Sequence, residues 1–469
     1  MSLRQKSKAR RHSPAGVRAK RSPGAKQGAS LPRRAISSLK WFYPGMRVKR
    51  WALVALFGFL IALLGIALTR PSESWDALSL PNGVLAWLGR TMHFSISSGT
   101  ATHWTGLCLS VVGLGLILFG FSRMIHSLTT AVFPGDTDLI LVDKVYKNRF
   151  LAQGARVVVI GGGTGLSTML RGLKRYTSNI TAIVTVADDG GSSGKIQKQL
   201  NILPPGDIRN CLVALADAEA TMTDLFQYRF KGNGTGEGLR DHAFGNLFIA
   251  AMSEISNGDF LQALQQASRV LNIRGRVLPS TLTQVCLWGE MEDGSKVTGE
   301  TNIAHSPLKI KRVGLSPADA QPLPEVIEAI EEADVVVIGP GSVYTSVVPN
   351  LLVPGIPEAL RRSRAKKVYI CNVMTQPGET DGFSVADHVK AIEGHVPRPV
   401  FDYVLVNTGV PTPELLNKYR QTGASLVEPD TDRIKHMGYR PVPGNFISQT
   451  DVVRHDPDSL AEAIMRILV

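Results

Sequence analysis

Two glycine-rich loops carry the residues of this sequence that are best suited to bind a phosphate. The first, Gly161-Gly162-Gly163-Thr164-Gly165, directly follows the β-branched run 156–160 and precedes a helical pattern. The second, Gly190-Gly191-Ser192-Ser193-Gly194, follows another apolar run and the acidic pair Asp188-Asp189. A helix that begins at such a loop leaves its first backbone N–H groups without partners, and these groups attract anions. The two loops therefore predict a nucleotide site.

The spacing of the glycines excludes two common phosphate-binding loops. A Walker A loop requires a lysine after its second glycine, and no lysine follows the glycines here. The dinucleotide fingerprint G-x-G-x-x-G fails at its third glycine, which is Leu166 counted from Gly161 and Thr168 counted from Gly163. The pair Asp188-Asp189 does stand where a ribose-binding carboxylate is expected. The pattern thus predicts a Rossmann-like phosphate site, with NAD as a weaker alternative ligand.

Polar residues in later loops could complete this site. In the loop 204–210, Asp207 is a candidate helix N-cap, and Arg209 could reach a phosphate or simply lie in a capped helix. Asn246 could cap a helix or contact a base or a sugar. Arg454 could close on a diphosphate or lie at a solvated helix start. The remaining candidates are Asn210, Gly341, Ser342 and Thr345.

Apolar runs that alternate with helical patterns indicate the fold of residues 154–469. The runs are short and mostly apolar, and they include 156–160, 181–186, 334–342, 366–373 and 402–407. Such strands predict a parallel sheet covered by helices on both faces, whose ligands bind at the carboxyl ends of the strands. Residues 276–313 alternate more and contain the turn Glu292-Asp293-Gly294, which predicts an inserted antiparallel hairpin. The expected class is α/β, with a Rossmann-like, mostly parallel sheet.

Two apolar segments precede this domain. Residues 51–69 are uncharged and long enough to cross a bilayer, and residues 105–122 repeat the pattern with glycines that allow close helix packing. A signal peptide fits poorly because the first segment starts fifty residues into the chain, and neither segment has the polar face of a core helix. We expect two transmembrane helices in a membrane anchor of residues 47–125, followed by a linker of residues 126–153.

The charge of the chain is concentrated at its N-terminus. Residues 1–50 contain 15 of the 52 Lys and Arg residues and none of the 39 Asp and Glu residues, so the rest is nearly neutral. We expect residues 1–46 to be a disordered basic tail that contacts anionic lipid rather than a specific nucleic acid. The basic flank before the first apolar segment predicts an inner (cytoplasmic) membrane location, with both termini and the large domain in the cytoplasm. The scattered cysteines fit a reducing compartment and argue against a disulfide framework or a zinc site: Cys108, Cys211, Cys286 and Cys371.

Six motifs of this sequence resemble the gluconeogenesis factor (YvcK) family, which is related to the 2-phospho-L-lactate transferases of deazaflavin cofactor biosynthesis. The motifs are VVVIGGGTGLSTMLRGLK, TAIVTVADDGGSSGKI, PPGDIRN, FGNLFIAAM, GPGSVYTSVVPNLLVPGI and CNVMTQPGETDGFSVADHV. The resemblance covers residues 155–469, and residues 1–150 lie outside it. It implies a Rossmann-like core that binds UDP-sugars such as UDP-N-acetylglucosamine. It also implies a role that links carbon metabolism to cell-wall precursor supply and cell shape.

The resemblance further implies which residues line the pocket. The segments 161–165 and 190–194 would line the phosphates, and the pocket would be completed by Asn246, Ser342, Thr345 and Arg454. In the transferase relatives, an acidic residue that matches the Asp188-Asp189 motif lies at the metal and acceptor site.

Two functions follow from these observations, and an NAD-binding protein is a weaker third alternative. The first is a membrane-tethered UDP-sugar-binding regulator that requires no cofactor and has a cell-wall precursor enzyme as a protein partner. The second is a phosphoryl-group transferase in which Asp188 or Asp189 is catalytic and binds Mg²⁺. Because the sequence offers no clear general base or activated nucleophile, it favours the regulator. Both functions are compatible with a monomer or a homo-oligomer.

Overall fold

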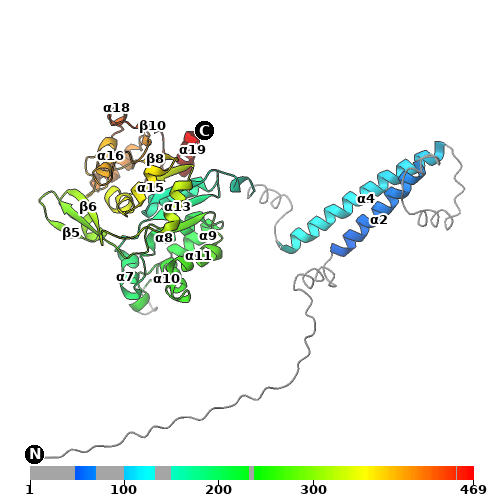
Figure 1. The fold of residues 1–469 in the computed structure, drawn as a ribbon, viewed down its shortest axis with the longest axis horizontal. Coiled ribbons are helices and arrows are strands. Elements are labelled where there is room, and N and C mark those ends of the chain that lie inside the picture. The colour runs from blue at the N-terminus through cyan, green and yellow to red at the C-terminus, as the bar shows by residue number, and fades with distance from the viewer. Residues whose placement is uncertain (1–47, 70–99, 133–148, 232–236, 450–451, 469) are drawn as a thin grey trace, which may run out of the picture. The chain divides into compact units, whose positions relative to one another are not determined.

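The chain forms two compact units, residues 1–142 and residues 143–469, which are described separately (Figure 1). The computed structural model describes residues 48–69, 100–132, 149–231, 237–449 and 452–468. The predicted basic tail, the loop between the two apolar segments and most of the predicted linker lie outside the described residues.

The first unit contains two long apolar helices, α2 (Val48–Thr69) and α4 (Thr100–Val132). Both are long and apolar enough to cross a membrane, as the sequence predicted. Helix α4 is longer than the predicted span 105–122 and continues into the predicted linker. The described part of α4 reaches Val132.

The two helices pack closely through small residues. A Cβ atom placed on Gly113 would lie 2.4 Å from the backbone nitrogen of Ala62, so the two backbones approach each other at this glycine. The other glycines of the interface are also crowded, and a Cβ atom on each would lie 2.5–2.8 Å from an atom of the facing helix: Gly58, Gly65, Gly106 and Gly120. Small residues of this kind are typical of helix pairs in membranes. The outer faces expose large apolar side chains, among them Leu53, Phe57, Leu114 and Leu118.

The second unit is built on a sheet of seven parallel strands in the order β10-β9-β8-β7-β1-β2-β3. The strands are β1 (Val157–Gly161), β2 (Ile180–Val184), β3 (Arg276–Pro279), β7 (Val335–Ile338), β8 (Lys366–Ile370), β9 (Tyr403–Asn407) and β10 (Arg440–Gly444). All residues of β1, β2 and β7 are buried, because helices cover both faces of the sheet. The Rossmann-like, mostly parallel sheet that the sequence predicted is confirmed.

The strand order reverses between β1 and β7. From β1 the chain adds β2 and β3 on one side, and from β7 it adds β8, β9 and β10 on the other. In open α/β sheets, the loops at the carboxyl ends of the two strands that flank such a switch point diverge and leave room for a ligand. Here these are the loops after β1 and β7, which contain the glycine-rich segments 161–165 and 339–342.

The predicted antiparallel insertion is also confirmed. Strands β4 (Cys286–Met291), β5 (Lys296–Thr298) and β6 (Ile310–Ser316) form a separate antiparallel sheet with β4 in the centre. Residues 276–279, which the sequence grouped with this insertion, instead pair in parallel with β2 as strand β3. A further two-stranded sheet near the C-terminus consists of β11 (Ile447–Gln449) and β12 (Val453–His455).

The helices fall into three groups along the chain. Between β1 and β3 lie α6 (Gly163–Leu173), α7 (Gly191–Leu200), α8 (Gly206–Leu215), α9 (Glu219–Gln227), η3 (Glu237–Leu239), α10 (Phe244–Ile255) and α11 (Phe260–Leu271). Between β5 and β8 lie α12 (Glu300–Ala304), α13 (Pro324–Glu332), η4 (Val343–Val347), α14 (Val348–Leu351) and α15 (Ile356–Arg362). After β8 come α16 (Val385–Glu393), α17 (Pro413–Gln421), α18 (Thr431–His436) and α19 (Pro457–Leu468). Helix α19 packs against α6, so the C-terminal helix supports the helix that follows the first glycine loop.

Candidate functional site

The loop after β1 has a conformation that depends on glycine. Gly163 has a φ of +66°, a region that other residues adopt only with strain. Helix α6 begins at this residue, and its N-cap Gly162 has no side chain to cap the helix. A Cβ atom on Gly165 would lie 2.5 Å from the carbonyl oxygen of Pro340. The glycines therefore allow the loops after β1 and β7 to touch at the switch point.

The loop after β2 repeats this arrangement. Helix α7 begins at Gly191 after the N-cap Gly190 and has no side-chain cap either. The N–H of Gly190 donates to Oδ1 of Asp188 at 2.9 Å, and this bond holds the carboxylate beside the start of α7. The hydroxyl of Ser193 accepts a hydrogen bond from the N–H of Gly206 at 3.0 Å. The second glycine loop thus contacts the start of α8 as well as the end of β2.

Asp207 connects the starts of α6 and α8. Its carboxylate accepts a hydrogen bond from the N–H of Gly163. A Cβ atom on Gly162 would lie 2.6 Å from Oδ2 of Asp207, and one on Gly206 would lie 2.9 Å from Oδ2 of Asp188. Three helix N-termini, those of α6, α7 and α8, therefore meet around two half-buried carboxylates.

The carboxylates at this junction hold their protons more strongly than usual. Burial raises the pKa of Asp207 to about 6, and the negative charge of Asp188 adds to this effect. Burial likewise raises the pKa of Asp188, although hydrogen bonds from Gly190 and Ser193 oppose the rise. A site that destabilises its own charged carboxylates favours any cation that neutralises them.

Two further carboxylates face the same region, and the sequence did not predict either of them as a site residue. Burial raises the pKa of Glu300 to about 9, with contributions from the charges of Asp188, Asp207 and Glu379. Burial also raises the pKa of Glu379 to about 7. Glu379 lies in a polar loop after β8, so its place at the carboxyl edge of the sheet is the sequence feature that could have indicated it as a site residue. Glu300 is brought in by the antiparallel insertion.

Asp189 has a different environment from Asp188. Its Oδ1 accepts hydrogen bonds from the backbone N–H of Thr301 at 3.0 Å and from the hydroxyl of Thr301 at 2.8 Å. Thr301 lies in the first turn of α12, so the carboxylate of Asp189 satisfies one of the free N–H groups at that helix start. This contact ties the second glycine loop to the antiparallel insertion.

Arg209 and Asn246 belong to a buried polar network. Nη1 of Arg209 donates to Oδ1 of Asn246 at 3.0 Å, and Nδ2 of Asn246 donates to the hydroxyl of Ser192 at 3.1 Å. The Ser192 hydroxyl also lies 3.1 Å from Nδ1 of His242. Asn210 accepts a hydrogen bond from Nη2 of Arg209 at 2.9 Å. The predicted residues Ser192, Arg209, Asn210 and Asn246 thus come together and fix the start of α7 against α8 and α10.

The predicted residues after β7 contact the loop after β8. The hydroxyl of Ser342 donates to Oε1 of Gln376 at 2.5 Å, and that of Thr345 donates to Oε1 of Glu379 at 3.1 Å. The N–H of Gly341 donates to Oδ1 of Asn372 at 3.3 Å. Oε2 of Glu379 is buried, and no described residue forms a hydrogen bond with it.

Arg454 is not drawn into these contacts. It is exposed on β12, which contacts α6, and among the described residues its guanidinium makes no hydrogen bond or ion pair. Thr164 is also exposed, in the first turn of α6. The structure therefore joins most of the predicted residues and leaves Arg454 on a neighbouring surface.

The oxygen atoms that Asp188 and Asp207 offer fit a divalent cation only when a bound ligand supplies further oxygen atoms. Within the described parts of the chain, no three His, Cys, Asp or Glu side chains gather as a metal site does. Asp188 and Asp207 offer two adjacent carboxylates. Mg²⁺ is commonly held by one or two carboxylates, with phosphate oxygens and water as its remaining ligands. The residues present therefore fit Mg²⁺ that arrives with a phosphorylated ligand.

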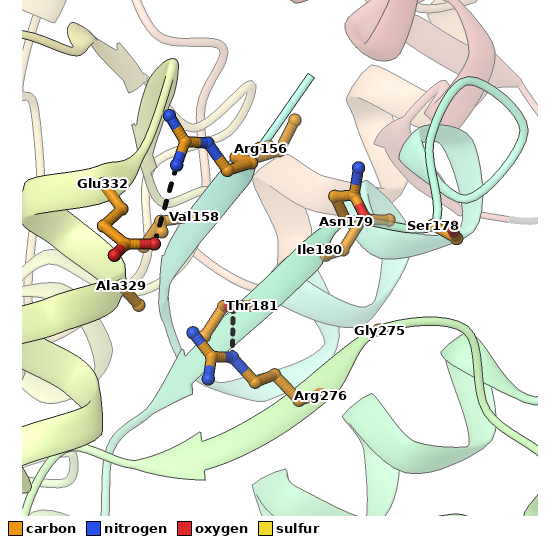
Figure 2. Close-up of a pocket in the computed structure, with 11 residues that line it drawn as sticks. Arg156, Val158, Ser178, Asn179, Ile180, Thr181, Gly275, Arg276, Ala329 and Glu332 are labelled. Atoms are coloured by element: carbon orange, nitrogen blue, oxygen red, sulfur yellow. Dashed lines mark hydrogen bonds and ion pairs between the residues drawn. The ribbon is translucent and has the colours of Figure 1, made fainter. Parts of the chain in front are cut away.

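A cavity of about 400 Å³ lies at the opposite edge of the sheet, at the amino ends of β1, β2 and β3 (Figure 2). Its charged side chains already have partners: Arg156 pairs with Glu332 at 3.5 Å, and Nε of Arg276 donates to Thr181 at 2.8 Å. The backbone N–H groups and carboxylates described above all lie at the other ends of the strands. This cavity is therefore separate from the candidate site.

Comparisons with known proteins identify the family of this chain. The family model described as 2-phospho-L-lactate transferase CofD matches residues 157–447. The gluconeogenesis factor of Halalkalibacterium halodurans is 52% identical over 311 residues, which are 66% of this chain and 95% of that protein. The gluconeogenesis factor of Bacillus subtilis is 49% identical over 320 residues, which are 68% of this chain and 99% of that protein.

A solved structure supports the same assignment. The crystal structure of a UPF0052 family member from Bacillus halodurans matches with a TM-score of 0.64 and 50% sequence identity, over 67% of this chain and 99% of that one. The parallel sheet and its switch-point loops thus define an α/β protein with a CofD-type domain. The chain belongs to the gluconeogenesis factor family, and the resemblance in its motifs is confirmed.

One relative also matches the N-terminal region. A protein from Nostoc sp. with gluconeogenesis factor in its name is 46% identical over 430 residues, which are 91% of this chain and 92% of that protein. This alignment is longer than residues 155–469, so it extends beyond the CofD-type domain into the preceding region. The N-terminal part, which we placed outside the resemblance, therefore has a counterpart in a longer relative.

Proposed function

We propose that this chain binds a UDP-sugar at the carboxyl edge of its sheet, between the loops after β1 and β7. The observation that carries the proposal is the meeting of the starts of α6 and α7, whose N-cap glycines offer no capping side chain, beside the carboxylates of Asp188 and Asp207. Uncapped helix starts present N–H groups and a positive dipole end to an anion. A diphosphate presents two adjacent phosphates, which suits two such starts.

A divalent cation would offset the repulsion between the carboxylates and a negatively charged ligand. Asp188 and Asp207 would hold Mg²⁺, which when bound supplies positive charge between the carboxylates and the diphosphate. The raised pKa values of both groups are consistent with this role, because burial disfavours the charged carboxylates and a bound cation would stabilise them. Binding of the UDP-sugar is therefore expected to be tighter with Mg²⁺ than without it.

We further propose that the protein acts as a regulator held at the inner membrane by α2 and α4. Such a protein would report the supply of cell-wall precursor, carried as a UDP-sugar, to an enzyme of that pathway. The family name supports the link to gluconeogenic carbon metabolism. The arrangement of Asp188 and Asp207 supports binding of a metal and a diphosphate.

Phosphoryl-group transfer, as in 2-phospho-L-lactate transferase, is the second candidate. The match to the CofD family model and the two glutamates favour it. Glu379 and Glu300, with pKa values raised to about 7 and about 9, are suited to exchange protons near neutral pH. In this case these glutamates would move a proton of an acceptor hydroxyl, and Asp188 would hold the metal.

Titration calorimetry of the full chain in detergent micelles tests both candidates. The ligands are UDP-N-acetylglucosamine, UDP-glucose, GDP and NAD, each with and without Mg²⁺. We expect heat with the UDP-sugars that increases in the presence of Mg²⁺, and no comparable heat with NAD. Absence of heat with every UDP-sugar would overturn the first proposal.

Phosphorus NMR of the same mixtures separates binding from turnover. A binding regulator leaves the UDP-sugar resonances intact over hours. A transferase forms a phosphodiester between the sugar phosphate of the ligand and the hydroxyl of an added acceptor alcohol, which breaks the diphosphate bond and releases UMP. Formation of a new phosphodiester or diphosphate product would favour the second candidate over the first.

A further inference from the structure

A basic cavity lies at the amino ends of β8, β9 and β10, at the opposite end of these strands from the candidate site. Its volume is about 690 Å³, which is within the usual size range of small-ligand pockets. Three segments line it, 363–367, 398–403 and 437–440, and each contains the first residue of one of the three strands. The cavity is thus fixed in shape by the sheet.

The lining of this cavity is strongly cationic. Five basic side chains and one acidic side chain, that of Asp402, contribute to it. The basic side chains are Arg364, Lys366, Lys367, Arg398 and Arg440. Such an excess of one charge within a concave surface focuses a positive potential and raises the local concentration of anions.

Two of the five cations have an acidic neighbour. Arg398 pairs with Glu393, and Nζ of Lys367 lies 3.9 Å from Oδ2 of Asp402. Glu393 and Asp402 are thus already paired with cations. The remaining three cations have no carboxylate partner among the described residues.

Among the described residues, the hydrogen bonds that these cations make go to neutral groups. Nη1 of Arg440 donates to the neutral hydroxyl of Tyr403 at 3.2 Å. Nζ of Lys366 donates to backbone carbonyls at the end of α19, including that of Leu468 at 3.3 Å. Arg364 is exposed, and within the described residues its guanidinium has no hydrogen-bond or ion-pair partner. Three cations from two strand starts and the preceding turn therefore surround one cavity.

We propose that this cavity is a second anion site, which binds a small molecule that carries phosphate groups. Guanidinium groups match phosphate oxygens in a bidentate geometry, and Arg364 and Arg440 are both available for such contacts. The ring of Tyr403, which lies 5.7 Å from the guanidinium of Arg440, offers an aromatic wall for the rest of the ligand. The site is independent of the proposed UDP-sugar site, since the two lie at opposite ends of the strands.

Calorimetry of the full chain in phosphatidylcholine nanodiscs, with pyrophosphate as the probe, tests this site. We expect Arg364→Glu to weaken pyrophosphate binding at this site at least tenfold. The double variant Arg364→Gln/Arg440→Gln should have a similar effect. Because Arg364 is exposed and makes no hydrogen bond or ion pair among the described residues, Arg364→Glu removes no such interaction, and an unchanged melting temperature is expected.

The matched control is Arg269→Gln/Lys309→Gln, which removes two exposed cations on α11 and next to β6. It changes the net charge by the same amount as the double variant and should alter binding less than twofold. Equal titrations for the double variant and this control would overturn the proposal. The pyrophosphate binding that depends on Arg364 should also weaken when NaCl is raised from about 50 to 300 mM, because salt screens the attraction between exposed charges.

Nanodiscs with phosphatidylglycerol distinguish the two sources of a phosphate group. If a lipid headgroup occupies the cavity, phosphatidylglycerol should suppress the component of pyrophosphate binding that depends on Arg364. If a soluble phosphorylated molecule occupies it, this component should be the same in both kinds of nanodisc.

Discussion

Asp189 accepts two hydrogen bonds from Thr301, one from its backbone N–H and one from its hydroxyl, although 112 residues separate the two in sequence. The neighbouring Asp188 instead bonds the N–H of Gly190 and interacts with the charge of Asp207. Adjacent residues of one acidic pair thus face different surroundings. Asp188 belongs to the candidate ligand site, whereas Asp189 bonds the start of α12 and thereby connects the second glycine loop to the antiparallel insertion.

The different surroundings of Asp188 and Asp189 predict opposite phenotypes. Asp188→Asn should weaken Mg²⁺-dependent UDP-sugar binding at least tenfold, because it removes one of two adjacent carboxylates. Asp189→Asn should leave the affinity within about threefold but lower the free energy of unfolding by about 1–2 kcal/mol, since its hydrogen bonds to Thr301 weaken. Calorimetry and pulse proteolysis in urea measure the two quantities on the full chain.

Asp319→Asn serves as the control for both variants, because this exposed aspartate lies in the turn after β6 and outside the site. It should change neither quantity. If Asp189→Asn abolished binding at unchanged stability while Asp188→Asn had no effect, the assignment of the two carboxylates would be reversed.

The contact between the loops after β1 and β7 predicts that Gly165 cannot be replaced. In Gly165→Ala, the new Cβ would lie 2.5 Å from the oxygen and 2.9 Å from the carbon of the Pro340 carbonyl. Both are backbone atoms, so the loops must separate. We expect UDP-sugar binding to weaken at least tenfold and the unfolding free energy to fall by about 1–3 kcal/mol, as for other overpacked sites.

The matched control for this variant is Gly238→Ala. Gly238 is exposed in η3, and a Cβ atom there would meet no heavy atom within 4 Å. Its affinity and stability should equal those of the unsubstituted chain. Normal binding by Gly165→Ala would mean that the ligand does not require contact between the two loops.

The features that the sequence predicted correctly are encoded locally. The strand, glycine turn and helix of residues 157–173 are adjacent in sequence, and the apolar runs of the parallel strands indicate burial on both faces. The two apolar helices could be predicted for the same reason, since their length and composition are properties of single segments. Helix α4 is longer than predicted because the residues at its ends are more polar than the apolar segment from which the span was predicted.

The features that the sequence did not predict depend on distant contacts. Glu300 enters the candidate site through the antiparallel insertion, and its raised pKa arises from burial and from carboxylates on three other segments. The separate roles of Asp188 and Asp189 depend on Thr301, which is in the same insertion. Arg454 was chosen for its charge, but its position on β12 depends on the pairing with β11 near the C-terminus.

The buried carboxyl group of Glu379 predicts how stability depends on pH. Burial raises its pKa to about 7 from a usual value near 4.5, so the folded chain keeps a proton that the unfolded chain loses. The unfolded state therefore binds fewer protons between about pH 4.5 and 7, and the free energy of unfolding falls as pH rises through this range. Glu300, with a pKa raised to about 9, extends the fall to higher pH.

Glu379→Gln should remove much of this dependence. At pH 8 the variant should be more stable than the unsubstituted chain by on the order of 2 kcal/mol, and at pH 5 the difference should be small. Pulse proteolysis in urea at both pH values gives the comparison. Glu254→Gln, at an exposed position on α10, should leave the pH profile unchanged. Destabilisation by Glu379→Gln at pH 8 would show that the ionised carboxylate is favourable in the fold.

The close packing of α2 and α4 predicts that two glycines of α4 differ sharply in their tolerance of substitution. A Cβ atom on Gly113 would lie 2.4 Å from the backbone nitrogen of Ala62 and 2.6 Å from the carbonyl oxygen of Gly58. A Cβ atom on Gly115 would meet nothing within 4 Å. Gly113→Val should therefore push the helices apart by about an ångström or more, because the new side chain would overlap the backbone of α2. Gly115→Val should leave the helices in place, because its Cβ atom would meet no atom of α2 within 4 Å.

The separation of the two helices can be measured in nanodiscs by electron paramagnetic resonance. Spin labels would be placed at the exposed positions Leu53 and Leu118, after the accessible cysteines Cys108 and Cys286 are replaced by serine. Because both glycines lie on the same helix and receive the same substitution, helix propensity changes in the same way. A longer or broader distance distribution in Gly113→Val alone would confirm that backbone contact at this glycine holds the pair together. Equal distributions in the two variants would show that the outer apolar faces, and not the glycines, determine how the helices associate.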